Sequence, residues 1–217
     1  MEQVAAGPIL SRTAALLRGD LLVAAMAVLL LSGLGTVLDL ARGSDGSGGL
    51  IVDSVAGVLA QYLVTKHLIK RTGLTAEGTA QGQFGAVLRV WLLSGIGIVL
   101  GFLLLVVPGV FLWIRWFAGV PVAIARGEGA MPALRDSWDM TRGSEWAILA
   151  VSAVIYAPFI IMLAVAVLLL DAAFPIPVVT MIANATLYGS MVAGWYAAIA
   201  FLELRKPTAG KLEQVFA

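Results

Sequence analysis

Arg115 is the residue of this sequence whose position most needs a chemical explanation. It lies within an apolar stretch, between Trp113 and Trp116. An arginine at the centre of a membrane helix costs about 3 kcal/mol on insertion scales, so it is expected to face the bundle interior beside a partner. Asp53 is the best-placed acid, and together they would form part of a substrate path, a site for an anionic headgroup or a structural ion pair. Alternatively, Arg115 reaches the outer headgroups between its two tryptophans.

Further polar side chains lie within apolar stretches and could line a cavity: Gln61, Tyr62, Tyr156, Asn184, Thr186 and Tyr188. Tyr156 and Asn184 are the two assigned to a site. With Arg115 and Asp53 they would line an intramembrane cavity, but hydrogen-bonding residues also hold the helices of ordinary bundles together. Both interpretations are open from the sequence.

A second group of residues could bind anionic lipid headgroups, because basic side chains beside a membrane span attract negatively charged lipids. The sequence predicts these contacts at the ends of apolar stretches: Lys66, Lys70, Arg71, Arg135 and Arg142. His67 lies among three of these cations, which is a poor setting for a metal ligand.

The sequence contains no recognisable catalytic arrangement. It lacks cysteine and has a single histidine, so we expect no catalytic, metal or cofactor site and no enzymatic activity. Walker, Gly-x-Ser-x-Gly and His-Glu-x-x-His motifs are also missing. The net charge of +1, without a basic stripe, gives no reason to expect nucleic acid as a partner.

The composition identifies the setting of these residues as a membrane. Of the 217 residues, 60% are hydrophobic and 12% are charged, and the mean hydropathy is +0.98. A soluble domain is about half apolar and a quarter charged, so a soluble globular enzyme is excluded. We expect an all-α, polytopic membrane protein in which residues 1–217 form one domain. Six apolar runs are the predicted transmembrane helices: 21–40, 50–69, 87–107, 110–125, 146–170 and 178–202.

The boundary between the third and fourth runs rests on length. The 39 residues from Val87 to Ala125 would extend about 58 Å as one helix, about twice the thickness of the hydrocarbon core. Pro108 and Gly109 are therefore expected at the tip of a tight hairpin. Pro121 would place a kink in the short fourth span.

The basic residues predict the orientation of the chain. With six alternating spans, twelve of the fourteen Lys and Arg residues fall on one side. Arg42 falls on the other side and Arg115 falls inside a span. Since basic connections stay in the cytoplasm, we expect both termini to be cytoplasmic.

Two short amphipathic helices are expected at that face, over residues 8–19 and 131–142. Each segment contains proline near its start and ends near a glycine, a pattern typical of a helix. Six positions align at a constant offset of 124, and four of these pairs are identical. The offset suggests parallel internal repeats of an interfacial helix and a transmembrane hairpin, although any amphipathic helix entering a membrane has a similar pattern.

One stretch resembles a known family. Val107-Pro-Gly-Val-Phe-Leu-Trp-Ile-Arg, with Ala133-Leu-Arg-Asp-Ser-Trp-Asp-Met-Thr-Arg-Gly, is similar to the YciC-like bacterial inner-membrane proteins. It also resembles the related membrane domain attached to some glycerophosphodiester phosphodiesterases. The resemblance implies a multi-pass protein of the bacterial inner membrane, and it implies no catalytic residue.

These observations favour a non-enzymatic protein that organises or assists envelope components. Its expected partners are the lipid bilayer, anionic headgroups, and either further copies of itself or another membrane protein. The alternative is a small transporter or exporter subunit with a path lined by the intramembrane polar residues.

Overall fold

A computed structural model describes residues 3–41, 48–75, 84–168 and 176–205. All of the regular secondary structure in these ranges is helical. In chain order the helices are α1 (Ala6–Gly19), α2 (Leu21–Ala41), α3 (Gly48–Thr72), α4 (Phe84–Leu104), α5 (Val106–Arg115), α6 (Gly119–Arg126), α7 (Ala130–Thr141), α8 (Glu145–Leu168) and α9 (Ile176–Leu204).

The apolar helices identify a membrane protein, as the composition predicted. Among the described residues, five segments are long and apolar enough to cross a bilayer: Leu21–Ala41, Phe84–Leu104, Val106–Arg126, Glu145–Leu168 and Pro177–Leu204. The 25-residue α3 is not one of these five segments. The all-helical membrane class is therefore confirmed, whereas six spans remain a prediction.

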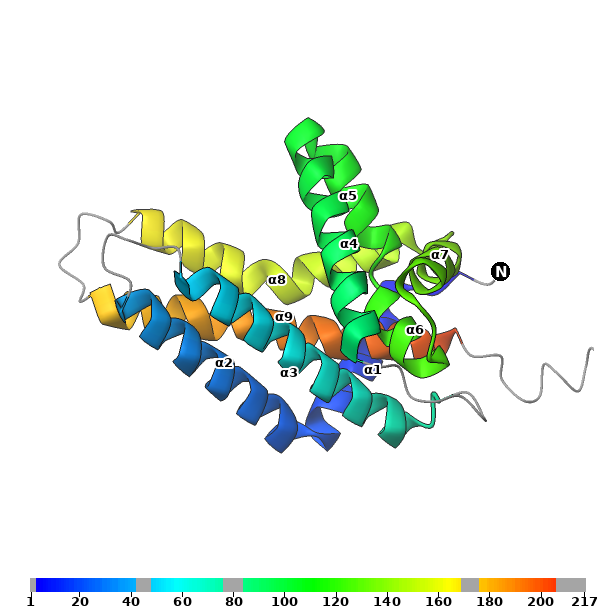
Figure 1. Ribbon diagram of the computed structural model, residues 1–217, viewed down its shortest axis with the longest axis horizontal. Helices are drawn as coiled ribbons and strands as arrows, with labels where there is room; N and C mark the ends of the chain where they lie inside the picture. The colour runs from blue at the N-terminus through cyan, green and yellow to red at the C-terminus, as the bar shows by residue number, and fades with distance from the viewer. Residues whose placement is uncertain (1–2, 42–47, 76–83, 169–175, 206–217) are drawn as a thin grey trace, which may run out of the picture.

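The long helices are arranged in two groups. Figure 1 shows α2, α3, α8 and α9 running along the long axis of the molecule, as a four-helix bundle. The hairpin formed by α4 and α5 crosses this direction steeply and stands away from the bundle. We call it the lateral hairpin. Helices α1, α6 and α7 gather at one end of the bundle, where the described chain also begins and ends.

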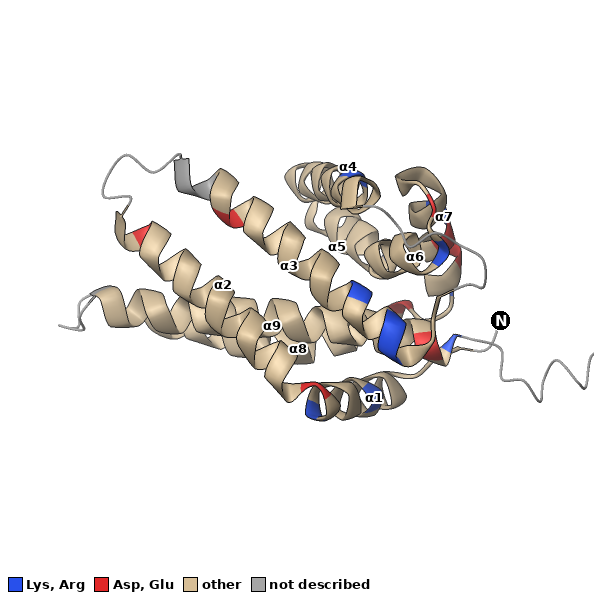
Figure 2. Cartoon of the chain, turned by 60° about the horizontal axis from the view of Figure 1, so that its bottom comes forward, with Lys and Arg blue, Asp and Glu red and all other residues tan. Residues whose placement is uncertain are grey.

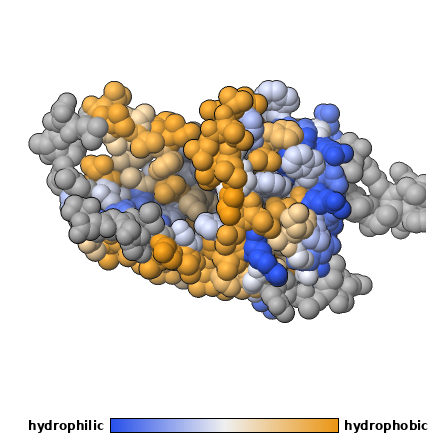
Figure 3. All heavy atoms as spheres, turned by 45° about the horizontal axis from the view of Figure 1, so that its top comes forward, coloured by the Kyte–Doolittle hydropathy of each residue, from blue (hydrophilic) through white to orange (hydrophobic). Residues whose placement is uncertain are grey.

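Charge separates the two ends of the bundle. Figure 2 shows that most basic and acidic residues lie at the end formed with α1, α6 and α7. We call this the charged end, and Arg12, Asp20, Lys70 and Arg126 belong to it. Apolar atoms cover most of the remaining surface, including the lateral hairpin, as expected for a surface in contact with lipid (Figure 3).

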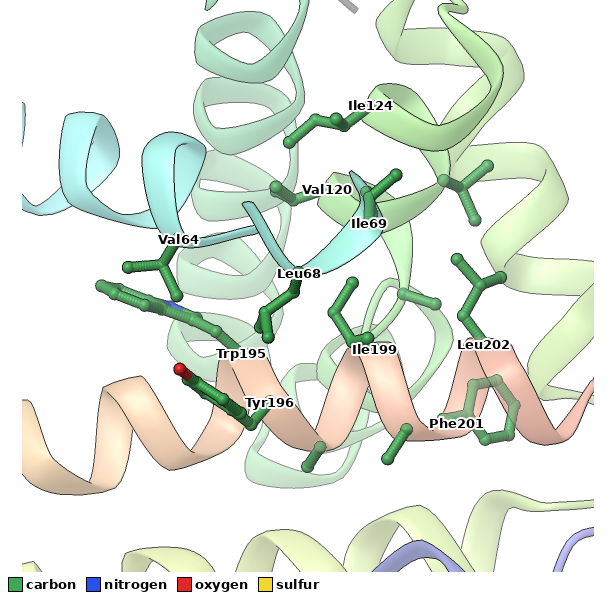
Figure 4. Packing of buried hydrophobic residues seen from close by; sticks show 14 of the residues in the cluster. Val64, Leu68, Ile69, Val120, Ile124, Trp195, Tyr196, Ile199, Phe201 and Leu202 are labelled. Carbon is green, nitrogen blue, oxygen red and sulfur yellow. The ribbon is translucent and has the colours of Figure 1, made fainter. Parts of the chain in front are cut away.

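Helix α9 is the central element of the core. Of its apolar stretch 61% is buried, against 17% for α2 and 11% for α8. Near the charged end, Ile199 and Phe201 of α9 are fully buried. Figure 4 shows this part of α9 packed beside α3, which contributes Leu68 and Ile69, and α6, which contributes Ile124. The packed core therefore lies toward the charged end.

The tip of the lateral hairpin differs from the predicted one. Helix α4 ends at Leu104, Leu105 is extended, and α5 begins at Val106, so Pro108 lies in the first turn of α5. A first turn accepts proline because its N–H groups have no partner within the helix. The expected tip at Pro108 and Gly109 is thus wrong by about one helical turn.

Two glycines allow the arms of the hairpin to approach closely. A Cβ atom on Gly101 would lie 2.9 Å from the backbone nitrogen and Cα of Gly109. A Cβ on Gly109 would in turn lie 2.5 Å from the ring of Phe102. Small residues at these positions therefore set the separation of α4 and α5.

The predicted fourth span, 110–125, is broken. Helix α5 ends at Arg115 and α6 begins at Gly119, with a turn between them. Pro121 lies in the first turn of α6, where it fits without a kink, so the irregularity precedes the proline that was expected to cause it.

The two segments predicted as interfacial helices are helical, over α1 and α7. They begin at Ala6 and Ala130, and the following helices begin at Leu21 and Glu145, which keeps the offset of 124 at both positions. The turns between them share one hydrogen-bond pattern, from Asp20 N to Leu17 O and from Ser144 N to Thr141 O. A full parallel repeat and a position at the membrane interface remain predictions.

Candidate functional site

Arg115 forms an ion pair at the charged end. It is the last residue of α5, and its Nη2 lies 2.8 Å from Oε1 of Glu145, the first residue of α8. The guanidinium lies 4.9 Å from the Phe111 ring centre and 5.4 Å from that of Trp138. The Arg115 side chain is 11% exposed. Its charge is thus balanced by a carboxylate and two aromatic faces.

Asp53 is not the partner of Arg115. It accepts a short hydrogen bond from the hydroxyl of Tyr188 on α9. Asp53 lies near the start of α3, whereas Arg71 at the other end of this helix pairs with Asp20 at the charged end. Helix α5 of the lateral hairpin ends at the charged end, so Arg115 lies at that end and Asp53 does not.

Asn184 belongs to the same distant polar group as Asp53. Its amide nitrogen donates to Oδ2 of Asp39 at 2.9 Å and to the hydroxyl of Thr36 at 3.4 Å, both on α2. Asn184 and Tyr188 are one helical turn apart on α9, so this group connects α2, α3 and α9. Such hydrogen bonds hold membrane helices together.

Tyr156 occupies a third location. Its ring meets that of Trp113 edge to face, with 5.5 Å between the ring centres. It also lines a crevice between the bundle and the lateral hairpin. The four polar residues expected in one intramembrane site therefore lie in three places, and they do not define one continuous path.

A serine on α7 bridges the break between α5 and α6. The Ser137 hydroxyl donates to the carbonyl oxygen of Arg115 at 2.8 Å and accepts from the backbone N–H of Ala118 at 3.2 Å. Ser137 is fully buried. Both backbone groups lose their helical partners at the break, so this hydroxyl satisfies a donor and an acceptor that burial would otherwise leave unpaired.

Ion pairs join α1 to the bundle and α6 to α7 at the charged end. Arg12 of α1 donates to both carboxylate oxygens of Glu203 on α9, at 2.7 and 2.8 Å. This hydrogen bond raises the pKa of Arg12. Arg126 of α6 pairs with Asp136 of α7. Paired in this way, α1 and α7 have fixed positions around the end of the bundle.

Asp20 links α1 and α2 to the end of α3. It pairs with Arg71, and its Oδ1 lies 3.3 Å from Nε2 of His67. Burial opposes ionisation of Asp20, but the hydrogen bonds from Arg71 and His67 outweigh it, so the pKa of Asp20 lies below its ordinary value. A Cβ on Gly19 would lie 2.8 Å from Nη2 of Arg71, so a larger residue there would make the end of the Arg71 side chain shift.

Three of the five predicted headgroup contacts have a side-chain partner within the chain, and the other two have no ion-pair partner among the described residues. Arg71 pairs with Asp20, Arg142 lies 3.5 Å from Asp139, and Lys66 donates to the Tyr62 hydroxyl at 3.2 Å. The exposed Lys70 and Arg135 have no ion-pair partner among the described residues. Arg18, which was not singled out, shares these two properties.

A groove runs along α7 at the charged end. Its volume is about 770 Å³, and its walls include Trp116, Trp138, Arg135 and Arg142. Three carboxylates also line it: Asp136 pairs with Arg126, Asp139 lies 3.5 Å from Arg142, and Glu128 is the third. The groove thus presents two indole rings beside the exposed Arg135.

Sequence reasoning missed the contacts of Glu145 and Ser137, and it named Tyr188 without its hydrogen bond to Asp53. Ser137 carried a signal, because it aligns with Thr13 at the offset of 124, and both are buried. Glu145 opens an apolar run and has no local feature that points to Arg115.

Comparisons with family models, curated proteins and solved structures give no match.

Proposed function

We propose that this chain is a non-catalytic, multi-pass protein of the bacterial inner membrane that organises or assists envelope components by binding anionic lipid headgroups. The main supporting observation is that three cations at the charged end have no ion-pair partner among the described residues. Arg18, Lys70 and Arg135 are exposed there, while neighbouring arginines are neutralised by carboxylates.

The arrangement suits lipid headgroups for electrostatic and steric reasons. Each basic residue near an anionic leaflet contributes about 1 kcal/mol of attraction. Helices α1 and α7 carry Arg18 and Arg135 on elements that ion pairs hold in place, so little ordering is needed on binding. Trp116 and Trp138 line the groove beside Arg135, and tryptophan favours the headgroup level of a bilayer.

The proposed topology has six spans, with α3 as the additional one and the charged end in the cytoplasm. The support is the distribution of basic residues, together with the position of both described chain ends at the charged end. Membership of the YciC-like family is proposed on the motif around Arg115 and Ser137 alone.

The proposal can be tested by measuring thermal unfolding in nanodiscs of two lipid compositions. We expect a higher midpoint in phosphatidylglycerol than in phosphatidylcholine, and a smaller difference at high salt, because exposed charges are screened. Equal midpoints in the two lipids would contradict the proposal. In sealed vesicles, protein-dependent flux of an ion or peptide tracer would favour the transporter alternative.

A further inference from the structure

The base of the lateral hairpin and the four-helix bundle enclose a crevice of about 450 Å³. Figure 3 shows the surface hollowed beside the hairpin. The walls come from α3, α4, α5, α6, α8 and α9. Four indole rings line it, from Trp91, Trp113, Trp116 and Trp195. Most of the residues that line the crevice are apolar.

A few polar groups are set into these apolar walls. Gln61 and Thr65 lie one helical turn apart on α3, and Ser152 of α8 also lines the crevice. Ser152 is 9% exposed, and its hydroxyl oxygen is buried without a hydrogen-bond partner among the described residues. A buried hydroxyl without a partner is costly, so this group is suited to a ligand that accepts its hydrogen bond.

Two cations lie beside the crevice. Lys66 follows Thr65 and contacts Tyr62, whose ring packs 5.5 Å from that of Phe84 at the start of α4. Arg89 is exposed, donates to the carbonyl of Gly85, and precedes the first α4 residue of the crevice wall. Both charges therefore lie near the first turns of α4.

Size and polarity limit what can occupy the crevice. A transmembrane helix about 10 Å wide would fill this volume with roughly one turn, so a partner helix does not fit. Apolar cavities disfavour water, and the indole rings make most of this wall apolar. A flexible hydrocarbon chain with a polar group at one end fits both the volume of the crevice and the few polar groups in its walls.

We propose that the crevice binds one acyl chain of a bilayer phospholipid. The chain lies along Trp113, Tyr156 and the apolar face of α9. Its ester carbonyl accepts the hydrogen bond of Ser152, and its phosphate lies toward Lys66 and Arg89. This site is separate from the cations of the proposed headgroup surface, and it requires no net charge on the lipid.

The test uses the full chain in phosphatidylcholine vesicles that contain a phospholipid with a diazirine on one acyl chain. After irradiation, mass spectrometry of peptides locates the label. We expect labelling concentrated on crevice residues of α5, α8 and α9, above that of exposed apolar positions on α2. Equal labelling of all lipid-facing helices would overturn the proposal.

A matched pair of variants tests occupancy. Gly95 lines the crevice, and a Cβ added there would meet nothing within 4 Å, so Gly95→Leu begins its larger side chain in open space. Gly33 on α2 is equally open but lies outside the crevice, and Gly33→Leu is the control. We expect a severalfold loss of crevice labelling in Gly95→Leu alone. Unchanged labelling in a folded Gly95→Leu protein would overturn the proposal.

A small substitution that preserves the fold gives an independent test. The chain has no cysteine, so Ser152→Cys introduces a unique thiol. A membrane-soluble maleimide should react with this thiol only slowly while lipid occupies the crevice, and faster in short-chain detergent. Rapid reaction with a charged, water-soluble maleimide in intact vesicles would indicate a water-filled path and contradict the proposal. These readouts are independent of the nanodisc test, since phosphatidylcholine is neutral.

Discussion

The Ser137 hydroxyl donates a 2.8 Å hydrogen bond to the backbone carbonyl of Arg115. A side chain of α7 thereby satisfies the end of a membrane helix that lies 22 residues earlier in the chain. At the same helix end, the Arg115 side chain forms an ion pair with Glu145. The break between α5 and α6, and thus the direction of the lateral hairpin, depends on these contacts.

Replacing Ser137 with alanine should destabilise the protein. Ser137→Ala leaves the Arg115 carbonyl and the Ala118 N–H buried without partners, which costs about 1–3 kcal/mol. Thermal unfolding in detergent measures the change. Ser11→Ala is the control, because Ser11 is exposed and bonds only within α1, so its effect should stay within about 0.5 kcal/mol. Equal effects would contradict the role of Ser137.

The pair of Arg115 and Glu145 should show energetic coupling. Arg115→Gln and Glu145→Gln each remove a charge-assisted hydrogen bond, with an expected loss of about 1.5–3 kcal/mol. The double variant should be less destabilised than the sum of the single ones. Strict additivity would argue against the pair. The double variant Asp53→Arg, Arg115→Asp should not regain the stability lost in either single variant, because Asp53 accepts a hydrogen bond from Tyr188 and does not pair with Arg115.

The close contact in the lateral hairpin predicts a specific sensitivity to size. Gly101→Ala should separate α4 from α5, since its Cβ would overlap the backbone of Gly109, and we expect a loss of about 1–3 kcal/mol. Gly95→Ala on the same helix has open space and should be neutral or stabilising, by up to about 1 kcal/mol. The reverse order of stability would show that the arms are not in contact at Gly101.

Asp20 should make stability depend on acid pH. Because the pKa of Asp20 in the folded protein lies below its ordinary value of 3.8, its ionised form stabilises the fold throughout the range above 3.8. This contribution is lost as the pH falls through the lower, folded-state pKa. Asp20→Asn should be less stable than the wild type at neutral pH and lose less stability on acidification.

The control for Asp20 is Asp139→Asn, whose side chain is half exposed in a 3.5 Å pair with Arg142. Such exposed pairs contribute little, so its unfolding curves should follow those of the wild type. Unfolding midpoints recorded from neutral pH to below 3.8 compare the three proteins. If Asp20→Asn and the wild type lost the same amount of stability on acidification, the stabilising role of ionised Asp20 would be contradicted.

Composition and periodicity predicted the membrane class because hydrocarbon imposes a strong constraint on residue type and length. The same analysis selected Arg115, since one charge among apolar residues is visible without a structure. Its partner Glu145 is 30 residues away in the sequence, and charge alone could not choose between it and Asp53.

The break after Arg115 and the direction of the lateral hairpin had no local signal. Trp116, Phe117 and Ala118 contain no helix breaker, while Pro121 and Pro108 are tolerated in first turns. Apolar helices also look alike whether they run along a bundle or across it. These features follow from tertiary contacts such as Ser137 to Arg115 and Gly101 to Gly109.

Lipid titration followed by native mass spectrometry is the most direct test of the proposed function. Wild-type protein should bind phosphatidylglycerol more tightly than phosphatidylcholine. At about 1 kcal/mol for each cation, the variant R18Q/K70Q/R135Q should lose roughly two orders of magnitude of this preference. The charge-preserving variant R18K/K70R/R135K should retain it. An unchanged preference in R18Q/K70Q/R135Q, or none in the wild type, would contradict the account.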